Sequence, residues 1–91
     1  MSYKVETTRQ ADEDLAKIPS PIMNQALSAF FEFAKSPSKF STRSTPTGYV
    51  RGQLFEVTIS HMGINCWVGI VFRYLPDEET LSVECVYTDH F

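Results

Sequence analysis

The most hydrophobic stretch of the chain runs from Ile64 to Leu75, and both of its alternating faces are largely apolar. A strand with two apolar faces is typical of the middle of a sheet, because a half-buried strand carries polar residues on one side. We therefore predict a central strand with one face covered by helices and the other covered less completely. Trp67 and Arg73 fall on that second face, which is where we expect any chemistry.

Periodic stretches before and after this strand predict the remaining elements. Alternating positions indicate strands, and apolar positions three and four residues apart indicate helices. The predicted elements are a strand at 2–6, helices at 7–18 and 20–36, and strands at 49–60 and 80–87. The first helix begins with a T-x-x-Q capping box at Thr7, and Pro19 ends it.

This order of elements predicts an α+β fold of the form β-α-α-β-β-β. The N-terminal strand and an antiparallel helical hairpin are expected to pack on one face of a small antiparallel sheet. A chain of 91 residues is expected to form one domain, residues 1–91.

The two short turns of the predicted sheet fix a register between its strands. The expected pairs are Ser60–Asn65 and Phe55–Ile70 across the first turn, and Leu75–Thr80, Phe72–Val83, Ile70–Cys85 and Val68–Tyr87 across the second. This register places Cys85 and Tyr87 on the helix-covered face. It also separates Cys66 from Cys85 by roughly 13 Å, which is too far for a disulfide, so we predict two free thiols.

The opposite face combines apolar and charged side chains around a notch at Gly69. Its members are Leu54, Glu56, Thr58, Trp67, Val71, Arg73, Glu84 and Val86. One interpretation is an ordinary solvated face, on which two glutamates balance one arginine. The other is a shallow concave site with Trp67 as a stacking platform and Arg73 as an anchor for phosphate or carboxylate.

A loop rich in serine and threonine, residues 36–48, joins the helices to the rest of the sheet. Most such loops are plain connections, but long loops often carry function. Lys39 and Arg43 therefore make this segment a candidate basic lid over a binding site.

Composition narrows the classes of function. The net charge is −3, with the basic residues concentrated in the middle of the chain, whereas proteins that grip nucleic acid usually have a basic surplus. The cysteines and histidines lack zinc-type spacing, and we expect no metal and no cofactor. No apolar run is long enough to cross a membrane and no signal peptide begins the chain, so we expect a cytoplasmic protein.

Several stretches resemble the RelE/ParE superfamily, the bacterial toxins of type II toxin–antitoxin modules. They are the opening Y-K-V-E-T-T-R-Q-A-D-E-D-L-A-K-I, the strand start G-Q-L-F-E-V, the central C-W-V-G-I-V-F-R-Y and the ending E-C-V-Y-T-D-H-F. The ending looks like the last strand and aromatic tail of YoeB-like members. The resemblance is one of pattern and spans nearly the whole chain, and it implies a RelE-like fold.

The resemblance also implies a chemistry. Ribonuclease members cut messenger RNA on the ribosome when a ribose 2′-hydroxyl attacks the adjacent phosphate, which needs a base, an acid and cations. Arg51 and His90 match catalytic positions of these members, and Arg73 and Tyr87 are the candidate substitutes for catalytic positions that this sequence lacks. Trp67 stands where an arginine is usual in that family, and Phe91 stands where a tyrosine is usual.

Three hypotheses stay open. The first is a ribosome-dependent endoribonuclease. The second is a non-enzymatic member that binds a protein, either its antitoxin or a target such as DNA gyrase. The third is a degenerate or repurposed RelE-like fold without nuclease activity. The acidic composition favours the second and third. The resemblance further implies a cognate antitoxin, for which the docking anchors would be Trp67, Leu54 and Val71.

Overall fold

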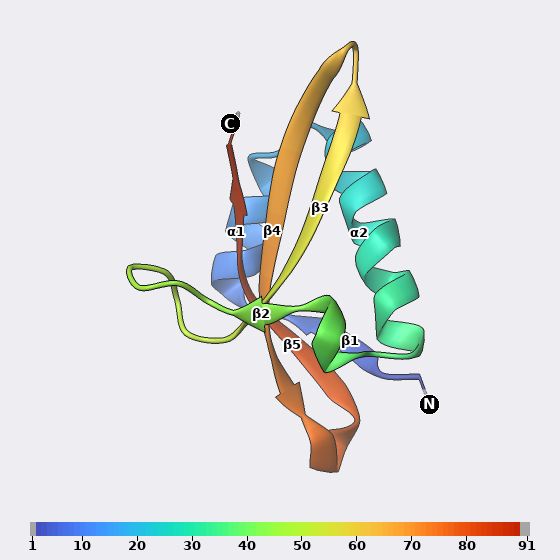
Figure 1. Cartoon of the computed structure of the whole chain (residues 1–91), viewed down its shortest axis with the longest axis vertical. Coiled ribbons are helices and arrows are strands. Elements are labelled where there is room, and N and C mark those ends of the chain that lie inside the picture. The colour runs from blue at the N-terminus through green and yellow to red at the C-terminus, as the bar shows by residue number, and fades with distance from the viewer. Residues whose placement is uncertain (1, 90–91) are drawn as a thin grey trace.

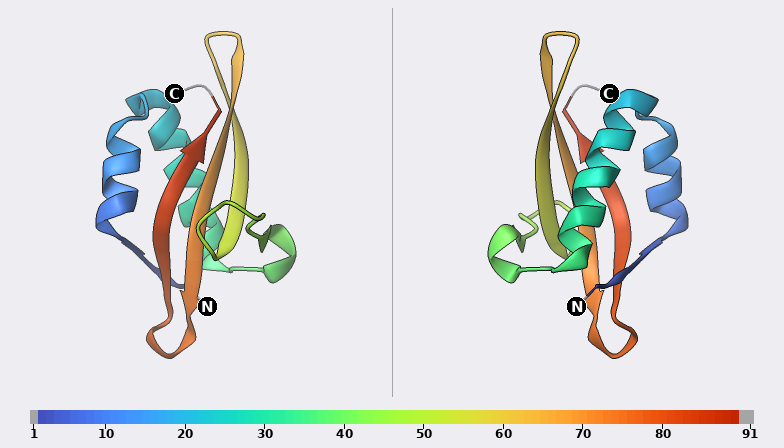
Figure 2. Two further views of the ribbon diagram at one scale, coloured as in Figure 1. Left: turned by 90° about the vertical axis from the view of Figure 1, so that its left-hand side faces the viewer. Right: turned by 90° about the vertical axis from the view of Figure 1, so that its right-hand side faces the viewer.

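The computed structural model describes residues 2–89, apart from the side chain of Lys39. A five-stranded sheet carries both helices on one side (Figure 1, Figure 2). The elements are β1 (Lys4–Thr7), α1 (Arg9–Ala16), α2 (Ser20–Lys35), β2 (Arg43–Ser44), β3 (Gln53–His61), β4 (Ile64–Leu75) and β5 (Thr80–Thr88), with short 3-10 helices η1 (Lys39–Ser41) and η2 (Pro76–Glu78). The α+β class and the predicted order of the helices and longer strands are confirmed.

The strands lie in the order β1-β5-β4-β3-β2, so β4 is central, as predicted. β1 pairs in parallel with β5, and the other neighbouring strands are antiparallel. The prediction of a purely antiparallel sheet is therefore wrong at this edge, and the sheet is mixed. A parallel pair needs a long connection, which the two helices and the β3–β4 hairpin supply. The predicted loop 36–48 also contains η1 and the two-residue strand β2.

Both helices begin close to the predicted positions. The Thr8 hydroxyl accepts a hydrogen bond from the Ala11 N–H at 3.2 Å, so Thr8 is the N-cap of α1. The predicted capping box at Thr7 is wrong by one residue, because the Thr7 hydroxyl instead donates to the Asp12 carboxylate at 2.6 Å. No helix within residues 2–89 is long and apolar enough to cross a membrane.

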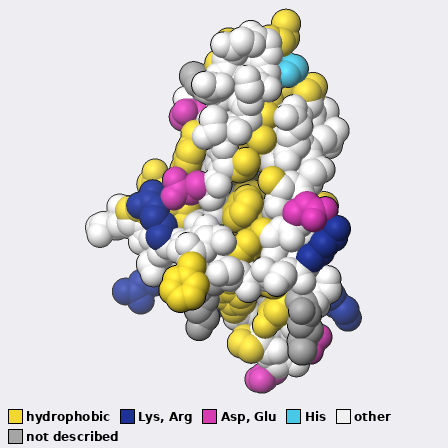
Figure 3. Space-filling view, turned by 45° about the vertical axis from the view of Figure 1, so that its right-hand side comes forward, with side chains coloured by type: hydrophobic (Ala, Val, Ile, Leu, Met, Phe, Trp, Pro, Cys, Tyr) yellow, Lys and Arg dark blue, Asp and Glu magenta, His cyan; other side chains and the backbone are white. Residues whose placement is uncertain are grey.

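The main hydrophobic core lies between α2 and the sheet. Phe30 is fully buried, and its ring centroid lies 5.3 Å from that of Phe72 and 5.4 Å from that of Phe55. Val68 and Ile70 of β4 belong to the same core, which confirms the face predicted to lie under the helices. Figure 3 shows hydrophobic side chains gathered in a strip along this side of the molecule.

The register between β3 and β4 is the predicted one over its whole length. Ser60 pairs with Asn65, and Phe55 pairs with Ile70. The turn between these strands has Met62 in the left-handed region at φ 52°. The hairpin extends beyond the helices at one end of the molecule (Figure 1).

The register between β4 and β5 is correct only near the turn. Leu75 pairs with Thr80 and Phe72 with Val83, but Val71 then pairs with Cys85, because Glu84 is the extra residue of a β-bulge. The predicted pairs Ile70–Cys85 and Val68–Tyr87 are therefore wrong. The bulge turns Cys85 and Tyr87 onto the face away from the helices. Val86, and not Cys85, therefore belongs to the main core.

Helix α1 binds the backbone of β5 next to this bulge. The Thr8 hydroxyl donates to the Glu84 carbonyl at 2.8 Å, and the Asp14 carboxylate accepts from the Val86 N–H at 3.0 Å. A bulge leaves backbone groups without partners in the ladder, and these two side chains supply them. Both cysteines are free thiols, as predicted, and they lie in different hydrophobic clusters on opposite faces of the sheet.

Candidate functional site

The sheet face away from the helices, which we call the second face, has a small hydrophobic cluster of its own. Leu54, Val71 and Cys85 are buried there, with Trp67 and Tyr87 packed against them. Leu54 is 1% exposed and Val71 is 0% exposed. The expectation that these two residues present exposed docking surface is therefore wrong, because larger side chains cover them.

Trp67 fills the notch that Gly69 leaves in this face. A Cβ atom at Gly69 would lie 2.6 Å from the indole Cη2 of Trp67 and 3.0 Å from Leu54 Cδ1. The indole N–H donates to the Glu56 carboxylate at 3.1 Å, and the backbone N–H of Trp67 donates to the Asp89 carboxylate at 2.9 Å. One hydrogen bond thus fixes the indole ring in the sheet surface, and the other fixes the backbone that carries it.

The arginines that accompany Trp67 are paired with glutamates. Arg43 Nε donates to Glu56 Oε1 at 2.7 Å, and Arg73 Nε forms an ion pair with Glu84 Oε1. The hydrogen bonds from Arg43 and then from Trp67 hold the pKa of Glu56 below its usual value of 4.5, although burial opposes them. Each glutamate thus neutralises an arginine that would otherwise be available to bind a phosphate group.

Arg51 differs from the other two arginines. It is exposed in the segment between β2 and β3, and it makes no ion pair within the described part of the chain. With Thr45, Pro46 and Tyr49 it lines a cavity of about 330 Å³ inside that segment. Arg51 is therefore a cation near the second face whose charge no described carboxylate compensates.

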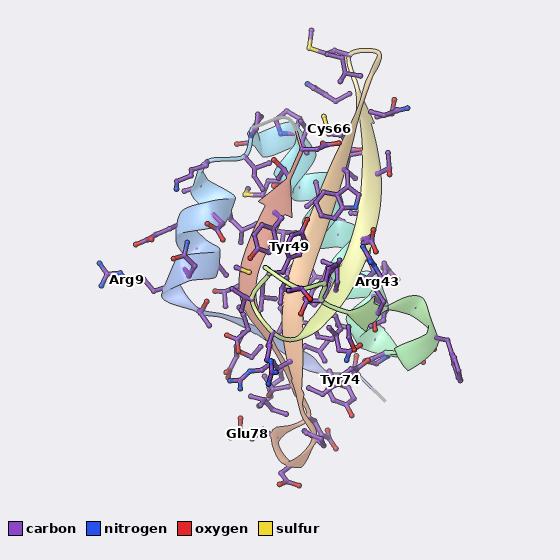
Figure 4. The ribbon with its side chains drawn as sticks, turned by 60° about the vertical axis from the view of Figure 1, so that its left-hand side comes forward. Arg9, Arg43, Tyr49, Cys66, Tyr74 and Glu78 are labelled. Carbon is purple, nitrogen blue, oxygen red and sulfur yellow. The ribbon has the colours of Figure 1, made fainter. Side chains whose placement is uncertain are left out.

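Residues 46–51, which we call the Tyr49 flap, lie over the second face (Figure 4). The Tyr49 ring stacks on that of Tyr87, with centroids 4.7 Å apart and planes inclined by 26°. The Val50 N–H donates to the Tyr87 hydroxyl at 3.2 Å. The strand predicted from Tyr49 onward begins only at Gln53, because the preceding residues form this flap.

Tyr87 and Cys85 form the polar part of the hydrophobic cluster. The Val50 N–H lowers the pKa of the Tyr87 hydroxyl, but burial and a hydrogen bond with Cys85 outweigh it and raise the pKa above 10.0. Burial likewise raises the pKa of the Cys85 thiol, more than its hydrogen bond with Tyr87 lowers it. Both groups are protonated at neutral pH, so neither is suited to act as a general base.

No protein-family model and no curated protein matches the chain, but solved structures do. The intact E. coli RelBE toxin–antitoxin complex matches with a TM-score of 0.67 at 14% identity, over 99% of this chain and 100% of that chain. The Mycobacterium tuberculosis RelBE2 complex matches with a TM-score of 0.69 at 19% identity, over 98% and 100%. A double mutant of the E. coli toxin RelE in the free state matches with a TM-score of 0.61 at 15% identity, over 94% of this chain and 82% of that chain.

The chain has the RelE fold. At 14–19% identity, the likeness establishes this architecture alone. It confirms the resemblance seen in the sequence. The chemistry implied by that resemblance is therefore to be sought on the second face of this RelE-like chain.

The RelE-like fold brings two of the implied catalytic residues, Arg73 and Tyr87, onto one face but not into contact. Arg73 pairs with Ser82 and Tyr87 pairs with Gly69, so the two lie four positions apart along β4. At ~3.3 Å per residue this is about 13 Å. Glu84 holds Arg73, and the flap occupies the space above Tyr87. His90 and the Lys39 side chain lie outside the described residues.

Some residues that shape this site escaped the sequence analysis. The contact of Tyr49 with Tyr87 is tertiary, although Gly48 and Gly52 on either side of the flap were a signal for a break in the strand. Asp89 stands next to the predicted His90 and binds the backbone of Trp67. Within residues 2–89, no three His, Cys, Asp or Glu side chains are grouped closely enough to hold a metal ion.

Proposed function

We propose that this RelE-like chain is the toxin-side component of a type II toxin–antitoxin module and that it acts by binding protein, without cleaving RNA. The observation that carries the proposal is the pairing of Arg43 with Glu56 and of Arg73 with Glu84. RNA phosphates are bound by cations that are free to replace counterions. A net charge of −3 further opposes binding of a polyanion.

An antitoxin is the partner this proposal requires. Two of the similar solved structures are toxin–antitoxin complexes, which supports such a partner here. Because Leu54 and Val71 are buried, we expect the antitoxin to use exposed apolar side chains. Those of Tyr49 and Val50 lie on the flap, and those of Met62 and Ile64 lie at the β3–β4 hairpin tip.

In this proposal the chain works in the cytoplasm and its target is a protein such as DNA gyrase. Expression alone should slow bacterial growth, and co-expression with the short open reading frame next to its gene should restore growth. The two products should also co-purify. A gyrase supercoiling assay on the purified chain tests that target directly. Normal growth on expression alone, together with no complex, would contradict the proposal.

Endoribonuclease activity is the second candidate, and one observation favours it. The β-bulge places Tyr87 on the same face as Arg73, and Arg51 is uncompensated by any described carboxylate. If this candidate is right, messenger RNA in a translating extract is cut by the native chain, and Arg51→Ala and Tyr87→Phe each reduce cutting at least tenfold. Arg9→Ala is the control, because Arg9 lies on α1, away from this face.

A further inference from the structure

We infer that the Tyr49 flap is a self-inhibitory cover, which must detach from Tyr87 before any ligand reaches that part of the second face. The inference rests on the proposed function only in taking the flap, with its exposed Tyr49 and Val50, as part of the surface that a partner uses. It assigns to the flap a gating role that the fold alone does not require, because antiparallel neighbours are commonly joined by loops of only about two to five residues.

The base of the flap is fixed to the sheet. The Thr45 N–H donates to the Gly52 carbonyl at 3.1 Å, and the Gly52 N–H donates to the Thr45 hydroxyl at 3.2 Å. Gly52 also presses against β4, since a Cβ atom there would lie 2.8 Å from the Phe72 carbonyl oxygen. These contacts define a closed neck from which the flap extends.

The tip of the flap is held to the body by one residue. Residues 46–51 are all exposed, so no apolar side chain anchors them in the core. The interactions that join them to the rest of the described chain are the Tyr49–Tyr87 stack and the hydrogen bond from Val50 to the same tyrosine. Loss of the contact with Tyr87 would therefore release the whole tip while the neck stays closed.

The same two contacts occupy the ring face and the hydroxyl through which Tyr87 could bind a partner. Tyr49 covers one face of its ring, and Val50 donates to its hydroxyl. A partner that stacks on Tyr87 or donates to its hydroxyl must therefore displace the flap first. Gly48, at φ +95°, allows the chain reversal that brings Tyr49 back over the sheet (Figure 4).

Amide hydrogen exchange of the isolated chain tests the attachment. The Val50 N–H should exchange about twofold to tenfold faster in Tyr49→Ala than in the native chain, because the ring stack is lost. Thr47→Ala is the matched control, since Thr47 lies on the flap without contacting Tyr87, and it should leave this exchange unchanged. The Ile70 amide in β4 reports whether either variant has disturbed the fold. Equal Val50 exchange in the native chain and in Tyr49→Ala would overturn the inference.

Nitration by tetranitromethane tests the covering of Tyr87. Mass spectrometry should show Tyr87 modified about twofold to tenfold faster in Tyr49→Ala than in Thr47→Ala. Tyr74, whose hydroxyl is buried, is the internal reference. Equal rates at Tyr87 in the two variants would show that the flap does not cover it. Neither measurement uses an antitoxin or RNA, so either can fail or succeed independently of the proposed function.

Discussion

Trp67 shows how one side chain changes the character of a sheet face. Its indole ring lies against Gly69 and Leu54, and its N–H is bound by Glu56, which also accepts from Arg43. A face that would be concave and apolar is thereby filled, and an arginine beside it is neutralised. The sequence predicted that Trp67 and Gly69 share this face, but it did not predict that one fills the space left by the other.

Gly69→Ala tests this packing. The added methyl group would lie 2.6 Å from the indole ring, so the ring or β4 must shift. We expect a loss of about 1–3 kcal/mol in the free energy of unfolding, as is typical of overpacking. Urea denaturation measures it. In a Trp67→Phe background the same substitution should cost less, and an equal cost in both backgrounds would contradict the proposed contact.

The lowered pKa of Glu56 predicts a pH-dependent contribution to stability. Because the folded-state pKa lies below 4.5, the ion pair stabilises the fold above that pH and is lost as the pH falls through the folded value. Both side chains are partly exposed, so the contribution is below about 1 kcal/mol. Glu56→Gln should therefore be less stable than the native chain at pH 7, and the difference should shrink as the pH falls below 4.5. A difference that does not change with pH would point to a cause other than ionisation.

At the scale of elements, β5 marks the limit of prediction from the sequence. The β3–β4 register followed from a tight turn and from matching apolar faces. The bulge in β5 has no local signal, because Glu84 is neither glycine nor a turn residue. It is tied to Thr8 and Asp14 of α1, which are distant in sequence and meet β5 only after the helix has packed. Tyr87 therefore lies on the face opposite to the predicted one.

Thr8→Ala tests the link between α1 and the bulge. The substitution removes both the N-cap of α1 and the partner of the Glu84 carbonyl. We expect a loss of about 1–2 kcal/mol in the free energy of unfolding. Thr7→Ala is the control and should cost less, because Thr7 bonds only to the exposed Asp12 side chain. Similar losses in the two variants would argue against Thr8 as the cap and bulge partner.

At the scale of the whole molecule, the chain combines a RelE-like architecture with a second face on which glutamates balance the charges of Arg43 and Arg73. The order of elements and their pattern were sufficient to predict the fold class and the resemblance. The neutralised arginines and the covered tyrosine of the site were not predictable in the same way. They depend on three tertiary contacts, which are Arg43–Glu56, Arg73–Glu84 and Tyr49–Tyr87. Each joins residues from different strands or loops.

Removing the balancing acids should create RNA affinity. The double variant Glu56→Gln with Glu84→Gln changes the net charge from −3 to −1 and frees both arginines. It should bind single-stranded RNA more tightly than Glu78→Gln with Glu79→Gln, which has the same net charge but changes the distant turn. The difference should shrink between 50 and 200 mM salt, roughly as counterion release requires. Equal binding by the two variants would show that the pairs do not control phosphate access.

The integrity of messenger RNA in a cell-free translation reaction tests the central claim most directly. The purified chain is added at micromolar concentration, and the ends of a translated message are mapped by primer extension. The balanced charges of the second face and the covered Tyr87 predict an intact message, with no new ends compared with a reaction that lacks the chain. Discrete new ends that depend on both the chain and active ribosomes would contradict the account and establish the ribonuclease.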